Sequence, residues 1–155
     1  MSAYNVVLSC TLTGVALSVS RIASGYQALG EGRSIVRLIR TALIRYEGRQ
    51  LNEDYCCYYD APVLVIASNE PTRTGGMDCA CALQNMFLAA HSLGIASCWI
   101  NQLSYTCDAP EVRAYLKRLG VPTVHKVYGC AALGYNGGKE PAAHPRKEGL
   151  VSYAE

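Results

Sequence analysis

The most reactive side chains in this sequence belong to eight cysteines and three histidines. The cysteines stand at positions 10, 56, 57, 79, 81, 98, 107 and 130, and the histidines at 91, 125 and 144. Thiolates act as nucleophiles and metal ligands, and imidazoles act as acids and bases near neutral pH. The histidines are far apart, however, and the sequence contains no G-x-S-x-G, G-x-x-x-x-G-K-[ST] or H-E-x-x-H motif. This pattern favours either a binding protein or an enzyme whose cofactor supplies the reactivity.

Two cysteine pairs, Cys56-Cys57 and Cys79-x-Cys81, are close enough in sequence to suggest metal binding or thiol redox chemistry. Neither pair has C-x-x-C spacing, and no histidine follows at the distance typical of zinc fingers. Other cysteines lie within apolar runs, such as Cys98 in SCWI and Cys130 in YGCAAL, where a free thiol behaves as a small hydrophobic side chain. We expect mostly buried, reduced thiols in a cytoplasmic protein without a metal site, with a thiol redox sensor as a minor alternative.

The only tryptophan lies in the segment LGIASCWINQL, residues 93–103, directly after an apolar pattern of helical period. That pattern predicts a helix over 78–93. Gly94 suits the position past the end of this helix because glycine adopts a left-handed backbone conformation without strain. A short strand over 97–101 follows. Such a strand brings its last residues to the rim of a sheet, where ligands of open α/β sheets commonly bind.

Other patterns predict the elements that must position this strand. Residues 32–48 have the spacing of an amphipathic helix, and residues 63–67 form the continuous apolar run of a strand buried on both faces. Asp108, Pro110 and Glu111 have the types and order of a helix start with side-chain caps. Gly120 ends that helix, and a last strand spans about 125–133. Strands and helices therefore alternate over 62–134, which is an α/β layout.

Length and composition indicate one domain over residues 1–155. Half of the 155 residues are hydrophobic, and the formal net charge is +2. This balance gives no reason to expect a nucleic acid or a membrane as partner. The apolar residues 6–19 have no basic residues before them and are too short to span a bilayer, so a strand is the simpler interpretation, with 4–9 as its candidate. The Gly-, Pro- and charge-rich residues 135–155 predict an extended arm.

Several segments taken together resemble a known family. They are DAPVLVIAS, DCACALQNMFLAAHSLGIASCWINQL, YLKRLGVP, VYGCAALGY and HPRKEGLVSY, in this order over about residues 51–155. They are similar to the C-terminal two thirds of flavoproteins of the nitroreductase family. The resemblance implies an α+β fold in which helices flank a central sheet, with an extended C-terminal arm. It also implies a homodimer that binds FMN and uses NAD(P)H to reduce nitro compounds, quinones or similar small organic acceptors.

The resemblance also implies where the cofactor binds. Trp99, Ile100, Asn101 and Gln102 would lie beside the isoalloxazine ring, with main-chain amides near Asn101 facing flavin N5 and O4. The basic pair Arg146 and Lys147 would bind the FMN phosphate. The sequence identifies no catalytic side chain. The simpler alternatives are that Trp99 and Ile100 are core residues and that the basic pair is solvated.

The N-terminal part departs from the family pattern. Family members open with an arginine- and serine-rich helix of the R-R-S-x-R kind that binds the FMN phosphate, and residues 1–31 contain no such segment. GRSIVR at 32–37 is similar to it, but we assign these residues to the later helix that precedes the strand at 63–67. The N-terminal segment is therefore atypical, either truncated or divergent. This leaves a second hypothesis open, a flavin-free member of the fold with a binding or structural role.

Overall fold

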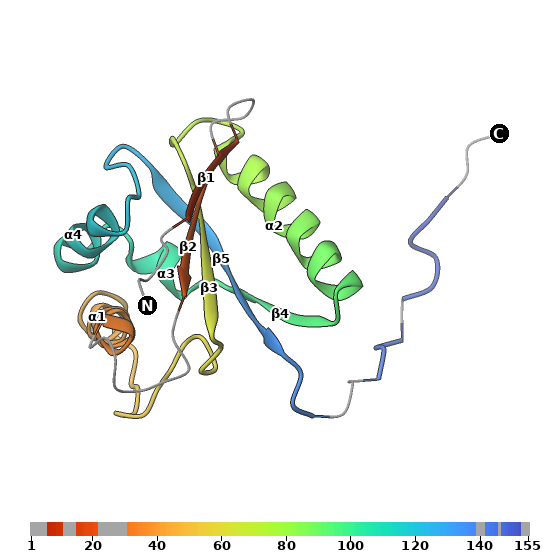
Figure 1. Cartoon of the computed structure of the whole chain (residues 1–155), viewed down its shortest axis with the longest axis horizontal. Helices are drawn as coiled ribbons and strands as arrows, with labels where there is room; N and C mark the ends of the chain where they lie inside the picture. Colours follow the sequence, from red (N-terminus) through yellow and green to blue (C-terminus); the bar gives the residue numbers. More distant parts are fainter. Residues whose placement is uncertain (1–5, 11–14, 22–30, 139–141, 146, 153–155) are drawn as a thin grey trace.

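The computed structural model describes residues 6–10, 15–21, 31–138, 142–145 and 147–152, with side chains from residue 36 onward. Within this part of the chain, five strands form one sheet in the order β1-β2-β3-β5-β4 (Figure 1). The strands are β1 Val6–Cys10, β2 Val15–Arg21, β3 Val63–Asn69, β4 Ile95–Ile100 and β5 Lys126–Tyr135. The helices are α1 Glu31–Glu47, α2 Gly75–Ser92, α3 Gln102–Thr106 and α4 Pro110–Arg118.

Every pairing in this sheet is antiparallel. The α+β class implied by the resemblance is thus confirmed, and the α/β layout expected from alternating strands and helices is wrong. The continuous apolar run of β3 does mark a strand buried on both faces, because six of its seven residues are buried. Burial on both faces requires helices on each side of the sheet, and antiparallel strands meet that requirement here as well as parallel ones.

The turn from α2 into β4 agrees with its sequence. Gly94 has a φ of +69°, and its N–H donates to the carbonyl oxygen of His91 at 3.0 Å. The chain can therefore leave the helix and reverse into β4 within two residues. Strand β4 ends one residue earlier than predicted, because Asn101 is the N-cap of the short helix α3. The sequence patterns did not predict α3.

The expected cap of α4 is wrong in detail. Pro110 is in the first turn as predicted, but the N-cap is Ala109, and no side chain caps the helix. The Asp108 carboxylate instead accepts a hydrogen bond from the Arg113 guanidinium at 2.6 Å. Glu111 is 3.8 Å from Arg45 of α1. Both acids pair with arginines that the fold brings close, and a charged partner outcompetes a free backbone amide.

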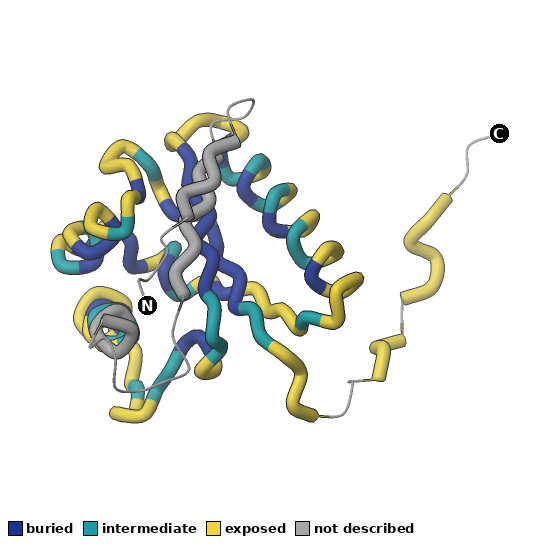
Figure 2. The backbone as a smooth tube through the Cα atoms, viewed as in Figure 1, coloured by how far each residue is buried: buried dark blue, intermediate teal, exposed yellow. Residues whose placement is uncertain are grey.

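Helices cover the two faces of the sheet unequally. Helices α1, α3 and α4 cover one face, and α2 covers the other, with β3 and β5 forming the buried centre between them (Figure 2). Side chains alternate between the faces along β3: Leu64 and Ile66 join the core under α1, α3 and α4, whereas Val65 and Ala67 join the core under α2. The period of two that characterises a strand thus supplies both cores from one segment.

The ends of the described chain differ. Strand β1 pairs with β2, and β2 pairs with β3. The strand predicted at 4–9 is therefore confirmed over residues 6–9, within β1, while residues 4 and 5 lie outside the described residues. After β5, the described residues form neither helix nor strand and run away from the body as an extended arm (Figure 1). No helix among the described residues is long and apolar enough to cross a membrane.

Candidate functional site

The end of β4 and the start of α3 place the four predicted ring-binding residues in one continuous turn. Hydrogen bonds join three of them: Trp99 Nε1–H donates to Asn101 Oδ1 at 2.5 Å, and the Asn101 main-chain N–H donates to Gln102 Oε1 at 3.2 Å. The Gln102 Nε2 group then donates to the hydroxyl of Tyr55 at 3.1 Å. The fold therefore brings together Trp99, Asn101 and Gln102 as predicted, and adds a tyrosine from a distant segment.

Trp99 lies over the α2 face of the sheet. Its ring meets that of Phe87 edge to face, with centroids 6.1 Å apart, and 36% of the residue is exposed. A Cβ atom built on Gly129 of β5 would be 2.5 Å from the Trp99 ring, so a side chain larger than hydrogen would displace the indole. Trp99 is neither a simple core residue nor a free surface residue, since a glycine makes room for it while part of it stays accessible.

Ile100 points to the opposite face from Trp99. It is 2% exposed and belongs to the core under α1, α3 and α4, where it is paired in register with Cys130. The core alternative therefore holds for the Ile100 side chain. A ligand at this strand end would meet only its main chain.

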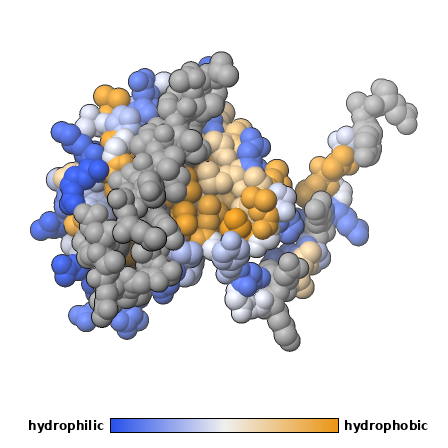
Figure 3. All heavy atoms as spheres, in the orientation of Figure 1, coloured by the Kyte–Doolittle hydropathy of each residue, from blue (hydrophilic) through white to orange (hydrophobic). Residues whose placement is uncertain are grey.

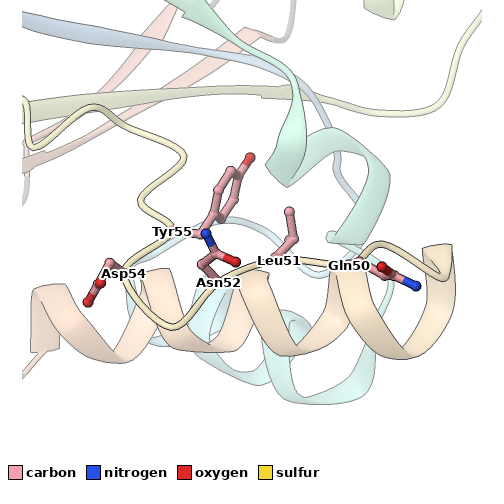
Figure 4. A pocket seen from close by; sticks show the side chains of 5 residues that line it. All are labelled: Gln50, Leu51, Asn52, Asp54 and Tyr55. Atoms are coloured by element: carbon pink, nitrogen blue, oxygen red, sulfur yellow. The ribbon is translucent and has the colours of Figure 1, made fainter.

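Two open cavities meet at Leu51 and Tyr55, and one of them reaches Gln102. The first, about 260 Å³, is lined by residues from α1, the segment after it, and the turn into α3: Leu43, Arg49, Leu51, Tyr55, Asn101, Gln102 and Tyr105. The second, about 300 Å³, shares Leu51 and Tyr55 and adds Gln50, Asn52 and Asp54 (Figure 4). In Figure 4, Tyr55 and Leu51 point to the same side, whereas Asp54 points away from them.

Sequence reasoning missed Arg49, Tyr55 and Tyr105 as site residues. Tyr55 belongs to a tyrosine-rich link whose sequence has no helical or strand period, so no pattern indicates which way its ring points. Arg49 follows Gly48, which has a φ of +63° and ends α1. A glycine that ends a helix just before a charged residue is the only signal that marked this position, and it indicates a turn but no ligand.

Of the two predicted phosphate-binding residues, only Lys147 belongs to the described part of the chain, and it is not beside the strand end. Lys147 is exposed and lies in the C-terminal arm, which runs away from the body (Figure 1). Arg146 lies outside the described residues. On this chain alone, then, the described residues bring no basic side chain of the arm to Trp99 or Gln102.

The cysteines lie mainly in the cores. Cys57, Cys79, Cys107 and Cys130 are buried, and the seven cysteines whose side chains the structure describes, from Cys56 onward, are free thiols. Cys98, expected in the core from its apolar neighbours, is exposed because β4 is an edge strand with little cover; Cys81 is exposed as well. Burial raises the pKa of the Cys57 thiol to about 12 and that of Cys79 to about 11. These two thiols stay protonated at neutral pH, which disfavours them as redox sensors.

Metal binding has no support within the described part of the chain, where no group of three His, Cys, Asp or Glu side chains is arranged to hold an ion. The donors at the strand end do suit the polar edge of a flavin ring, which carries hydrogen-bond acceptors. The Asn101 main-chain N–H already has Gln102 Oε1 as an acceptor, so a flavin there would replace that oxygen with one of its own. The residues present thus fit the ring of FMN, and among the described residues of the C-terminal arm none is placed to hold its phosphate.

Comparison with known proteins gives consistent matches. The model of the nitroreductase family matches residues 37–135. A nitroreductase structure with bound FMN from Bacteroides fragilis is 46% identical, covers 99% of this chain and 82% of its own, and has a TM-score of 0.82. A nitroreductase with bound FMN from Desulfitobacterium hafniense is 20% identical, over 92% and 77% of the two chains, with a TM-score of 0.71.

An FMN-dependent nitroreductase from Clostridium difficile is 15% identical, over 98% of this chain and 83% of its own, with a TM-score of 0.69. At such low identity, this similarity and that to the Desulfitobacterium protein concern the fold alone. A comparison with curated proteins gave no significant match. The family match begins within α1 and therefore extends further towards the N-terminus than the sequence motifs at 51–155.

Proposed function

This chain belongs to the nitroreductase family, and on that premise we propose that it is an FMN-dependent oxidoreductase that uses NAD(P)H to reduce a small organic acceptor, such as a nitro compound or a quinone. The observation that carries the proposal is the hydrogen-bonded turn of Trp99, Asn101 and Gln102 at the end of β4. Further support comes from the 46% identity to a protein whose structure holds FMN.

When bound, FMN would supply the redox chemistry, namely hydride transfer from NAD(P)H and two-electron reduction of the acceptor. The protein binds and orients the ring. In this proposal the Asn101 main-chain N–H donates to the polar edge of the flavin, and Trp99 covers part of the site from the α2 face. An amide donor on a fixed main chain stabilises negative charge that develops on the ring, once the flavin has replaced Gln102 Oε1 as its acceptor.

We also propose that the protein is a homodimer. Leu88 and Leu93 are 61% and 72% exposed near Trp99's strand, and Figure 3 shows apolar side chains gathered on the face that carries α2. Strand β4 forms an edge of the sheet, and an apolar edge of this kind is usually covered in the native assembly. A second copy would cover it. The arm of that copy could then bring its own Lys147 to this strand end and complete the phosphate site.

The first test is flavin binding. The purified protein is expected to keep flavin absorbance after incubation with FMN and desalting, and NADH or NADPH is expected to bleach it. Asn101→Ala should weaken FMN binding about tenfold, because it removes the acceptor that orients Trp99. Asn85→Ala, on the exposed side of α2, is the matched control and should leave the affinity unchanged. A protein that stays colourless at high FMN would overturn the proposal.

The second test is the mass in solution. Light scattering should give twice the chain mass of 16.7 kDa. A monomer that still binds FMN tightly would contradict the homodimer while leaving the flavoprotein proposal intact. The choice between NADH and NADPH, the physiological acceptor and the cytoplasmic location stay predictions.

One observation favours a second candidate function, a flavin-free protein with a binding or structural role. Within one chain, the described residues of the C-terminal arm bring no phosphate-binding cation to the strand end. The two candidates differ in the dimer, because only the enzyme needs the partner's arm. Deleting residues 136–155 should abolish FMN retention in the enzyme, whereas a flavin-free protein would lose no cofactor.

A further inference from the structure

We propose that the 260 Å³ pocket beside Gln102 is a subsite for a small planar ring that bears an anionic group, either the carboxylate of an acceptor or the phosphate of the nicotinamide nucleotide. The proposal rests on the proposed oxidoreductase function and adds to it a preference for anionic ligands. Asn101 and Gln102 belong both to the turn at the end of β4 and to the wall of this pocket, so a ligand there would lie next to the flavin.

The charge of the pocket is positive. Arg49 is the only charged residue among the described residues that line it. Among the described residues, the ion pairs involve Arg45 and Arg113 instead, and no carboxylate pairs with Arg49. The main-chain N–H of Arg49 donates to the carbonyl of Leu43 at 3.2 Å, which holds the turn that carries this arginine. A guanidinium without a competing acid is suited to bind a carboxylate or a phosphate.

The other polar groups of the pocket also favour an anion. The network at the strand end engages the side-chain oxygens of Asn101 and Gln102 as acceptors and the Tyr55 oxygen as a further acceptor. The donors that this network leaves for a ligand are the Asn101 side-chain Nδ2 group, the second Nε2 hydrogen of Gln102 and the Tyr55 hydroxyl proton. Because the network links residues 55 and 101–102, these donors are held in place before a ligand binds.

Two leucines and two tyrosine rings in the lining favour a ligand that carries a ring. The pocket contains Leu43 and Leu51 as well as the rings of Tyr55 and Tyr105, and Tyr105 is 57% exposed. Its volume is below that of pockets that hold drug-sized molecules, which leaves room for about one substituted ring. The adjacent cavity contains Asp54, which points away from Tyr55 (Figure 4) and would repel an anion. The anion is therefore expected on the Arg49 side of Leu51 and Tyr55.

Fluorine NMR of 4-fluorobenzoate and its neutral analogue 4-fluorobenzamide tests this subsite on the purified protein, before and after loading with FMN. The benzoate should bind at least about tenfold more tightly than the benzamide, and Arg49→Gln should remove that difference, consistent with one charge-assisted hydrogen bond. Arg37→Gln is the matched control: it removes the same charge from an exposed position of α1 outside the pocket and should change neither affinity.

Two further experiments identify which ligand supplies the anionic group. If nicotinamide mononucleotide displaces 4-fluorobenzoate, the subsite takes the phosphate of the reductant. If it does not, and Arg49→Gln raises KM for 4-nitrobenzoate but not for 4-nitrobenzamide, the subsite takes the carboxylate of the acceptor. Equal affinity for the two fluorinated probes, equal effects of the two arginine variants, or loss of benzoate binding on FMN loading would each overturn the proposal.

The outcomes separate this inference from the function on which it rests. Reduction of the neutral 4-nitrobenzamide tests the oxidoreductase without any demand on Arg49. Reduction of that compound combined with absent benzoate binding would refute the subsite alone. Benzoate binding that depends on Arg49 in a protein that retains no FMN would refute the oxidoreductase and leave the anion site established.

Discussion

The two faces of the central sheet differ in how many buried residues pack against them. Under α1, α3 and α4, eighteen of the described residues form a continuous buried core, whereas under α2 only five do: Val65, Ala67, Cys79, Leu83 and Ala131. The same strands supply both cores. The difference arises from the cover, because three helices and the tyrosine-rich link close one face, and a single helix closes the other.

This difference explains where the accessible chemistry lies. On the α2 face, Trp99, Leu88 and Leu93 remain exposed, and β4 is the edge strand of the sheet that the described residues form. On the opposite face, Ile100 from the same strand is fully packed. A site at the end of β4 thus combines a rigid side, which fixes the backbone, with an open side that a flavin and a second subunit can cover. Rigid support for an open site is what precise positioning of a ligand requires.

The largest loss of stability is expected from a substitution in the core under α1, α3 and α4, the closed face of the sheet. Leu116 of α4 is fully buried there. Leu116→Ala should lower the free energy of unfolding by about 2–5 kcal/mol, because truncation leaves a cavity that the surrounding helices cannot fill. Urea denaturation followed by circular dichroism measures this. A loss below about 1 kcal/mol would show that this face is less tightly packed than the structure indicates.

The contact between the Trp99 ring and strand β5 should be the next most sensitive to substitution. Gly129→Ala puts a Cβ atom 2.5 Å from the indole and should cost about 1–3 kcal/mol of stability, with a shift in the emission of the only tryptophan as the ring moves. Gly137→Ala is the control, since nothing lies within 4 Å of its added Cβ. Unchanged emission and stability in Gly129→Ala would mean that Trp99 does not pack on Gly129.

The buried thiols should make the closed face sensitive to alkaline pH. Burial raises the pKa of Cys57 from 9.0 to about 12 in the folded protein. The folded state keeps this proton between pH 9 and 12 while the unfolded state loses it, so the stability contribution is complete below pH 9 and falls as pH rises through this window. Each pH unit costs about 1.4 kcal/mol for this one group.

Denaturation at pH 9, 10 and 11 measures that slope. The slope should decrease in Cys57→Ala, whatever the stability of this variant at pH 7, and should stay unchanged in Cys81→Ala, whose thiol is exposed. Cys107 and Cys130, whose pKa values burial also raises, lie in the same core and should add to the slope. A stability that does not vary above pH 9 would contradict the burial of these thiols.

The smallest effect on stability is expected from a substitution on the α2 face of the sheet, the open face. Leu88→Gln should change the free energy of unfolding of the isolated chain by less than about 0.5 kcal/mol, because Leu88 is 61% exposed. If this face meets a second copy, the same change should weaken dimerisation in analytical ultracentrifugation. Ile44→Gln, at an exposed position of α1 on the other side of the sheet, should not. Equal effects of the two variants would place the interface elsewhere.

Sequence reasoning reached most of the elements and part of the site. The periods of α1, α2 and β3 were read correctly because each depends on side chains a few residues apart. The cap of α4 was misjudged because Asp108 and Glu111 have arginine partners that only the fold brings near. Cys98 was expected in the core because its neighbours are apolar, and a strand's own sequence does not reveal that it lies at an edge.

The sequence by itself determined the local conformations and the family. Helical and strand periods, the glycine after α2, and the motifs of residues 51–155 are properties of neighbouring residues. Only the tertiary structure decided that the sheet is antiparallel and that Trp99 lies on Gly129. It also decided that Gln102 donates a hydrogen bond to Tyr55, which lies 47 residues away in the sequence. These contacts depend on how whole elements dock. Docking is set by the summed burial of two faces of the sheet, which no single stretch of the sequence contains.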